Sequence, residues 1–530
     1  MTDEPQIPAS PQPYSPAGQR PGHQAGVPGP PAAQPAADAS SGLPADGPVP
    51  AAELQLPGRA DEHGWRRMHM ITPALKSWKI IVAFVLFMTQ TRFDDFVSHR
   101  FDPGYVDQPR FPGQFFEAFL IQIAVFAGML ALGTVWAVLS WRMTKYRLQG
   151  DTVQMQSGVL FRQQRRARLD RLQAVDINQP LLARVFGLSE VKIEVAGGTG
   201  ADIELSYLAN ADAQQVRRTL LARAAGLSYD EDQGAPEAPQ HLVYRLETDR
   251  LVKSVLLGTG PVSIVIAAAL LALALLVMDM PAGVPIVLPM LLGAIGATWA
   301  GFAGRYGFEV AASQDGVRLG YGLLDRRKQT VPPGRVQALQ IHQPVLWRWP
   351  GWWQIRINVA GYGLLKPNEG GNILAPVVTQ DEASQIVALI VADLGTPNPM
   401  EVFSAGLVGT GHDGGYTPAP ARSRWLDLIS WRRNGFCLTD TVLLARAGRL
   451  TRRLILVPHA KVQSLGLSQG PLQRLLRLAS VAVHSTPGPA NPRVEHLSVA
   501  DAAWLMSTEE VRSRQARAVA GPVRWMTDSQ

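Results

Sequence analysis

The chain has 530 residues, a formal net charge of +7 and a single cysteine, Cys437. One cysteine excludes an internal disulfide and a cysteine-based zinc site, and the length allows three or four domains of about 150 residues. A basic balance is typical of proteins that meet an anionic partner such as a lipid surface or a nucleic acid.

The chain opens with a proline- and alanine-rich segment over residues 1–65. A segment with so few large apolar residues buries too little surface to offset the entropy of the chain. We therefore predict a disordered cytoplasmic tail.

Apolar stretches further along predict two transmembrane hairpins, over residues 66–140 and 251–303. A helix crosses about 30 Å of hydrocarbon with about 20 apolar residues. Basic residues flank the spans, and the positive-inside rule then places both termini and every large polar segment in the cytoplasm of a multi-pass inner-membrane protein. The first stretch is short enough to be an interfacial helix instead. The four spans are expected at about 77–92, 115–139, 254–277 and 283–302.

A motif in the polar segments occurs three times. R-L-Q-A-V-D-I-N-Q-P-L-L from Arg171 returns as R-V-Q-A-L-Q-I-H-Q-P-V-L from Arg335 and as K-V-Q-S-L-G-L-S-Q-G-P-L from Lys461. The copies align without a gap from a shared glycine onward, so each copy belongs to one repeated domain. The shared positions, read as structural, are Gly158, Gln173 and Gln179, then Gly322, Gln337 and Gln343, then Gly448, Gln463 and Gln469.

Each copy has the period-two alternation of β-strands, as in I-R-I-N-V at 355–359, and ends in a helix-like segment. Short strands with one closing helix predict a partly open barrel. The two glutamines of each motif bracket an apolar pair, and we expect their amides to fix strand register by bonding backbone, with ligand binding as the alternative.

The spans followed by W-R-M-T-K-Y-R-L, G-V-L-F-R, the repeated motif and V-A-G-G resemble the bacterial pleckstrin-homology (PH) domains that are fused to transmembrane hairpins, as in YdbT-like membrane proteins. The third copy departs from the pattern, with Gly470 where Pro180 stands. The resemblance covers about 66–520 and implies no catalysis, with a link to envelope stress and tolerance of antimicrobial peptides. It implies three β-rich PH-like barrels, each closed by a C-terminal helix, over 141–226, 304–395 and 425–520, with linkers at 227–250 and 396–424, the second of them flexible.

Motifs that carry chemistry are few. G-T-G-H-D-G at 409–414 matches a dinucleotide pattern, yet no strand is predicted before it and no helix after it, so we expect a flexible linker. The histidines have no metal-ligand spacing and no catalytic set emerges. The sequence therefore predicts neither an enzyme nor a bound cofactor or metal.

Basic residues recur after each shared glycine and are predicted to contact anionic lipid head groups, at about 1 kcal/mol per residue near a membrane surface. Solvated turns that keep the protein soluble are the alternative. Nucleic acid is not an expected partner, because no aromatic side chains alternate with the arginines. The predicted contacts are Arg162, Arg326 and Arg452, and Arg171, Arg335 and Lys461.

The sequence thus predicts a non-enzymatic scaffold or adaptor in the membrane, which contacts the lipid bilayer and either a protein partner or a second copy of itself. The alternative is an accessory subunit of a membrane transporter or membrane enzyme complex. The spans carry almost no charge, whereas ion pathways place charged residues inside the membrane.

Overall fold

The computed structural model describes most of the chain beyond residue 112, together with a few residues between 61 and 84. The expected tail over 1–65 and the expected span over 77–92 lie almost wholly outside the described residues. The long described stretches are 112–149, 152–169, 172–195, 203–224, 240–273, 284–313, 316–360 and 372–519.

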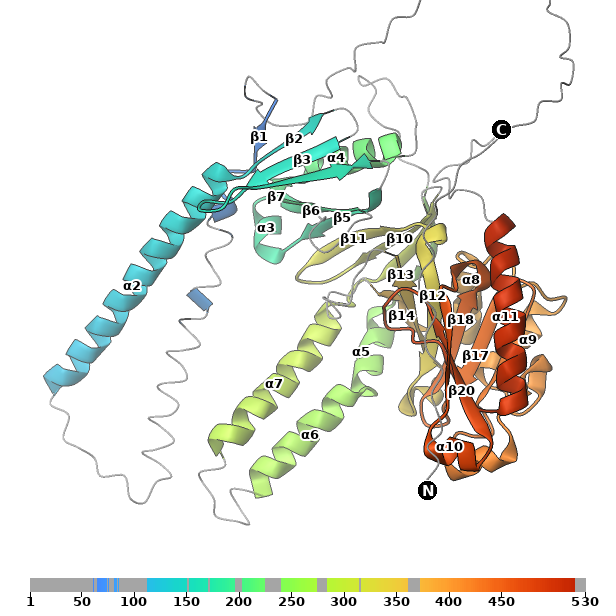
Figure 1. The fold of residues 1–530 in the computed structure, drawn as a ribbon. Helices are drawn as coiled ribbons and strands as arrows, with labels where there is room; N and C mark the ends of the chain where they lie inside the picture. Colours follow the sequence, from blue (N-terminus) through green and yellow to red (C-terminus); the bar gives the residue numbers. More distant parts are fainter. Residues whose placement is uncertain are drawn as a thin grey trace, which may run out of the picture. The chain divides into compact units, whose positions relative to one another are not determined.

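Three successive units share one plan, in which two antiparallel sheets are followed by a closing helix (Figure 1). The core of unit 1 lies between its sheets and the closing helix, and includes Tyr146, Val175 and Leu220. Its first sheet is β1 (Arg66–Arg67), β2 (Lys145–Gln149), β3 (Thr152–Ser157) and β4 (Gln163–Arg168). Its second sheet is β5 (Leu172–Gln179), β6 (Leu188–Val195) and β7 (Ile203–Ala209), with α3 (Leu181–Val185) after β5 and α4 (Asn210–Ala224) closing the unit.

Units 2 and 3 repeat this order. Unit 2 contains β8 (Gln240–Arg245), β9 (Glu309–Ser313), β10 (Gly316–Tyr321), β11 (Arg326–Val331), η5 (Pro333–Arg335), β12 (Val336–Gln343), η6 (Leu346–Arg348), β13 (Trp353–Val359), β14 (Ile373–Val378) and α8 (Gln380–Ala388). Unit 3 contains β15 (Thr417–Pro418), β16 (Gly435–Leu438), β17 (Val442–Ala447), β18 (Arg452–Pro458), η9 (His459–Lys461), β19 (Ser464–Ser468), α10 (Pro471–Leu475), β20 (Leu478–His484), β21 (Arg493–Ser498) and α11 (Val499–Val519).

Neighbouring units are joined by strand pairing. The second sheet of unit 1 continues through β5 and β11 into the first sheet of unit 2, which gives a seven-stranded sheet. The second sheet of unit 2 continues in the same way through β12 and β18 into unit 3. We call these two contacts the joints.

Apolar helices lie between the first and second strands of units 1 and 2. Helix α2 (Pro112–Met143) leads directly into β2, and its part Leu120–Met143 is long and apolar enough to cross a membrane. In unit 2 the corresponding place holds α5 (Thr248–Leu256), α6 (Thr259–Ala272) and α7 (Val284–Ala303).

Among the described residues there are therefore one or two candidate spans, where the sequence predicts four. Helices α5 and α6 count as one span only if they are taken together across a bend of 42°. Pro261 accounts for the bend, because it lacks an N–H and its ring would clash with the carbonyl of Leu257, four residues earlier, in an unbroken helix. The described apolar part of α7, Val287–Ala303, is shorter than a span.

Two predicted linkers contain regular structure. Residues 240–250 of the expected linker 227–250 form β8 and the start of α5. The expected flexible linker 396–424 contains α9 (Pro399–Leu407), η7 (Asp413–Gly415), β15 and η8 (Ala421–Trp425), and Val402, Phe403 and Leu407 of α9 are buried. Their burial explains the difference, because glycine and proline around α9 conceal an apolar face that packs on unit 3.

Candidate functional site

The shared glycine of each repeat begins the turn between the third and fourth strands. Gly158, Gly322 and Gly448 have φ values of 110°, 107° and 76°. A Cβ at these positions would lie 1.9, 2.0 and 2.2 Å from the carbonyl oxygen three residues later. Only glycine fits such a backbone, so these residues shape the turns.

In units 1 and 2 the turns lie at the end of the first sheet where the apolar helices enter. In unit 2 the backbone N–H of Leu323 donates to the carbonyl of Ala303, the last residue of α7, at 2.8 Å. In unit 1 Lys145 pairs with Gln156, so the turn at 158–162 lies beside the C-terminal end of α2. We call this end of the sheets the turn edge, formed by residues 158–162, 322–325 and 448–451.

Large apolar side chains at the turn edge are exposed. Leu160 and Phe161 are 77% and 82% exposed, and Leu450 of unit 3 is 59% exposed. Arg162 follows them directly and is also exposed. Two adjacent apolar side chains in water beside an arginine match the chemistry of a lipid interface, where apolar tips enter and cations meet head groups.

Unit 3 has a loop where units 1 and 2 have apolar helices. The loop, residues 419–434 between β15 and β16, exposes Trp425, Leu428 and Ile429 by 66%, 79% and 51%. The guanidinium of Arg424 lies 5.4 Å from the ring centre of Trp425. We call this segment the apolar loop.

Hydrogen bonds hold the apolar loop against the turn of unit 3. The backbone N–H of Gly448 donates to Asn434 Oδ1 at 3.2 Å, and that of Arg449 donates to Ser430 Oγ at 3.3 Å. The apolar loop therefore adds to the turn edge in unit 3, where no apolar helix lies between the first two strands.

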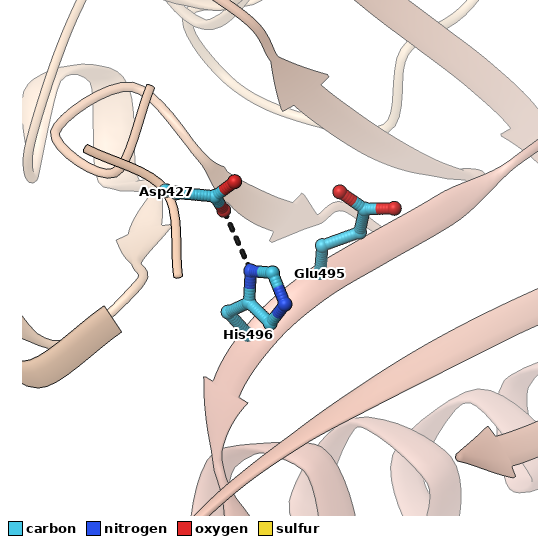
Figure 2. Close-up of side chains that lie close together, drawn as sticks. All are labelled: Asp427, Glu495 and His496. Carbon is cyan, nitrogen blue, oxygen red and sulfur yellow. Dashed lines mark hydrogen bonds and ion pairs between the residues drawn. The ribbon is translucent and has the colours of Figure 1, made fainter. Parts of the chain in front are cut away.

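A hydrogen bond from His496 on β21 also fixes the apolar loop, as Figure 2 shows. Its Nδ1 lies 2.6 Å from Asp427 Oδ2, which also accepts from Asn434 Nδ2 at 2.8 Å. Ligand atoms of Asp427, Glu495 and His496 all lie within 4.8 Å of one another, a set that could hold a divalent cation. Because Asp427 already accepts two hydrogen bonds, the geometry supports first of all a tie between loop and sheet.

Three of the predicted lipid-contacting cations bond the preceding unit at the joints. Arg335 Nη2 donates to the carbonyl of Leu172 at 3.2 Å, and Lys461 Nζ donates to that of Gly334 at 2.8 Å. Burial lowers the pKa of both groups, and the charge of Arg335 lowers the pKa of Lys461 further. Arg452 donates to Gln343 Oε1 at 3.3 Å. Each of these side chains bonds the preceding unit.

The other predicted cations are placed differently. Arg162 and Arg326 are exposed, and Arg326 stands opposite Gln179 in the first joint. Arg171 lies outside the described residues.

The repeated glutamines bond backbone in units 2 and 3. Gln343 Nε2 donates to the carbonyl of Trp352 at 3.1 Å, and Gln469 Nε2 donates to that of Leu478 at 2.8 Å, which is the same contact in the two units. Gln337 Nε2 donates to the carbonyl of Arg335 at 3.3 Å. Gln463 is exposed, and the side chain of Gln173 lies outside the described residues.

Sequence reasoning missed a second pair of joint contacts. Arg184 Nη2 donates to the carbonyl of Leu323 at 3.1 Å, and Arg348 Nη2 donates to that of Leu450 at 2.7 Å. Both arginines follow the repeated glutamine by five positions, and Arg474 occupies that position in unit 3. The alignment of the repeats contains this signal, since arginine stands there in every copy.

Two buried arginines carry no such signal. Arg446 is 1% exposed and donates to the carbonyls of Arg433, Ala405 and Gly411. Arg433 donates to the carbonyl of Leu407, at the end of α9, at 2.7 Å. Burial, together with the charges of nearby arginines, lowers the pKa of Arg433 to about 9. These cations hold the glycine-rich segment 409–414, which is consequently an ordered part of unit 3.

Two-sheet units closed by a helix, repeated three times and with apolar helices between strands, define a PH-like repeat protein. The Bacterial PH domain family matches residues 113–224, 252–394 and 404–508, and the chain belongs to this family. It is 23% identical over 288 residues to the UPF0699 transmembrane protein YdbT of Bacillus subtilis (strain 168), a match that spans 48% of this chain and 58% of that protein. The name of that relative and the candidate spans agree with a membrane location.

Proposed function

We propose that the protein is a non-enzymatic scaffold that holds three PH-like units against the cytoplasmic surface of the inner membrane. The observation that carries this proposal is the turn edge, where exposed Leu160 and Phe161 lie beside the C-terminal end of an apolar helix. If α2 crosses the bilayer, the turn at 158–162 lies at the lipid interface, because it lies beside the end of α2 at which the chain leaves the membrane.

The same reasoning extends to unit 3. The apolar loop presents Trp425, Leu428 and Ile429 at the turn edge, and tryptophan prefers the membrane interface. We infer that this loop rests on the bilayer in place of a hairpin. All three units then meet the same surface, which suits a platform for envelope maintenance.

Arginines at the turn edge favour anionic lipid over zwitterionic lipid. Arg162, Arg424 and Arg449 are all exposed there. Each basic residue near such a surface contributes about 1 kcal/mol, and the contribution falls with salt. We propose anionic head groups as the polar partner of the turn edge.

A fluorescent label at the turn edge tests this function. A Phe161→Cys chain, with Cys437→Ser as background and an environment-sensitive dye on the new thiol, is reconstituted into vesicles with and without an anionic lipid. We expect blue-shifted emission and protection from an aqueous quencher, both stronger in the anionic vesicles. In intact cells, a thiol reagent that cannot cross the membrane is expected to leave this cysteine unmodified.

The matched control is Gln149→Cys, at the opposite end of β2 and exposed. Its dye is expected to stay accessible to the quencher in every vesicle. Equal quenching at the two positions would refute lipid contact at the turn edge, and labelling of Phe161→Cys from outside the cell would refute the cytoplasmic placement.

A further inference from the structure

Among the described strands, the two outermost of the row of units have no partner on one side. The first sheet ends at β4 and the last sheet ends at β19, and no described strand pairs with the outer side of either. In the repeat, β4 corresponds to β11 and β18, while β19 corresponds to β5 and β12. The first and last units therefore each carry one of the two strands that a joint needs, β4 in unit 1 and β19 in unit 3.

The joint is built in the same register both times. Arg326 stands opposite Gln179 in the first joint, and Arg452 stands opposite Gln343 in the second. These are equivalent positions of the repeat, so one geometry is used twice within the chain. Applied to β19 of one copy and β4 of another, that register sets Ser468 opposite Gln163, and Leu467 opposite Gln164.

Burial differs where the partner strand is missing. Leu339 and Ile341 on β12 are both 0% exposed beneath the second joint. On β19, Leu467 occupies the position of Ile341 and is 54% exposed. A groove of about 530 Å³ runs between the start of β19 and α11, and its lining is mostly polar, with Leu465 and Met506 among the apolar side chains. An apolar strand edge beside a groove is the form of surface that accepts an added strand.

The β19 end also carries the arginine that corresponds to those of the internal joints. Arg184 and Arg348 each donate to a carbonyl in the turn of the following unit. Arg474 is the third member of this series and is exposed on α10. In a joint between two copies its target is the carbonyl of Leu160. One contact would not recur in the same form, because Arg517 already donates to the carbonyl of Val462, the counterpart of Leu172.

Charge on β4 does not argue against pairing. Charged side chains often protect edge strands from association, and β4 has the sequence Q-Q-R-R-A-R. Yet β11 begins R-R-K and pairs with β5 through these residues. The joint thus tolerates cations at this place in the strand.

We propose that copies of this protein associate head to tail, with β19 of one copy adding to β4 of the next in the register of the internal joints. Such a contact joins two different surfaces, so it produces either a ring or an open row. Arg184 and Arg348 keep the short helix of each unit beside the turn of the next. The assembly would therefore keep its turn edges on one side.

Crosslinking between two differently tagged full-length chains in membranes tests the proposal. One chain carries Ser468→Cys and the other Gln163→Cys, both with Cys437→Ser. Cα atoms paired across antiparallel strands lie about 4.5–5.5 Å apart, within the reach of a disulfide. With a mild oxidant we expect a mixed dimer in the mixture and none from either chain alone. A chain with both cysteines is expected to give a series of larger species or one closed ring.

Ser464→Cys with Gln163→Cys is the control, because it is out of register by four residues and is expected to give no product. Leu467→Arg and Arg474→Ala change exposed side chains at the β19 end, and each is expected to reduce the large species in light scattering. Folded chains that stay monomeric in the membrane, or that crosslink only through two copies of Ser468→Cys, would overturn the proposal. Capture of a different protein by β19 with no contact between copies would overturn it as well.

Discussion

The burial difference between Ile341 and Leu467 makes the energy of a joint measurable. The two residues hold the same place in the repeat, with Ile341 0% and Leu467 54% exposed. Ile341→Ala removes a fully buried side chain, which costs about 2–5 kcal/mol. Leu467→Ala removes a side chain that is already half in water, so we expect a cost below about 1.5 kcal/mol.

Hydrogen exchange suits a large chain in detergent, because it reports local opening rather than one global transition. At about 1.4 kcal/mol per tenfold change, Ile341→Ala should speed exchange of β12 and β18 by between about 30-fold and a few thousand-fold. Leu467→Ala should speed exchange of β19 and β20 by less than about tenfold in a monomeric sample. Equal acceleration at the two sites would refute the view that the neighbouring unit buries Ile341.

Two further changes test the second joint and the ordered segment of unit 3 that includes α9 and residues 409–414. Burial, with Arg356, Arg305 and Arg453, lowers the pKa of His342 to about 3. The folded pKa lies below the unfolded value of about 6.5, so stability is full above pH 6.5 and is lost as the pH falls towards 3, by about 1.4 kcal/mol per unit. His342→Asn should flatten the dependence of Tm on pH between 7 and 4.5, and identical slopes would count against a neutral buried imidazole. Arg446→Lys leaves buried carbonyls without donors at about 1–3 kcal/mol each, so proteolysis within 396–424 should quicken several-fold, and an unchanged half-life would show that the arginine does not hold this segment.

The repeat could be predicted from the sequence because three copies of one motif fall at fixed distances. Alternation in I-R-I-N-V located β13, and a helix-like pattern after each motif located the closing helices. The turn glycines follow from the same alignment, since their backbone excludes any other residue. All of these features depend on residues that are close together in the sequence.

The joints could not be predicted, because strand pairing between units depends on surfaces distant in sequence. Arg335 and Lys461 look like free cations in the sequence, yet each bonds a carbonyl of the preceding unit. Helix α9 was not predicted for a related reason. Its flanking glycines and prolines are typical of linkers, while the arginines that hold its end come from later in the chain, Arg433 from the apolar loop and Arg446 from β17. Local composition does not record such contacts.

The shared sheets change where the chain can be divided. A fragment cut between repeats, such as 141–226, keeps β5 but loses β11, and so exposes a strand edge that the whole chain covers. A fragment from β5 to β11, residues 172–331, contains every strand of the first seven-stranded sheet. Each seven-stranded sheet therefore combines the second half of one repeat with the first half of the next. The boundaries of the sheets lie half a domain away from the boundaries of the sequence repeats. Fragments intended for crystallisation or interaction screens should begin and end within repeats, between the two sheets of one unit.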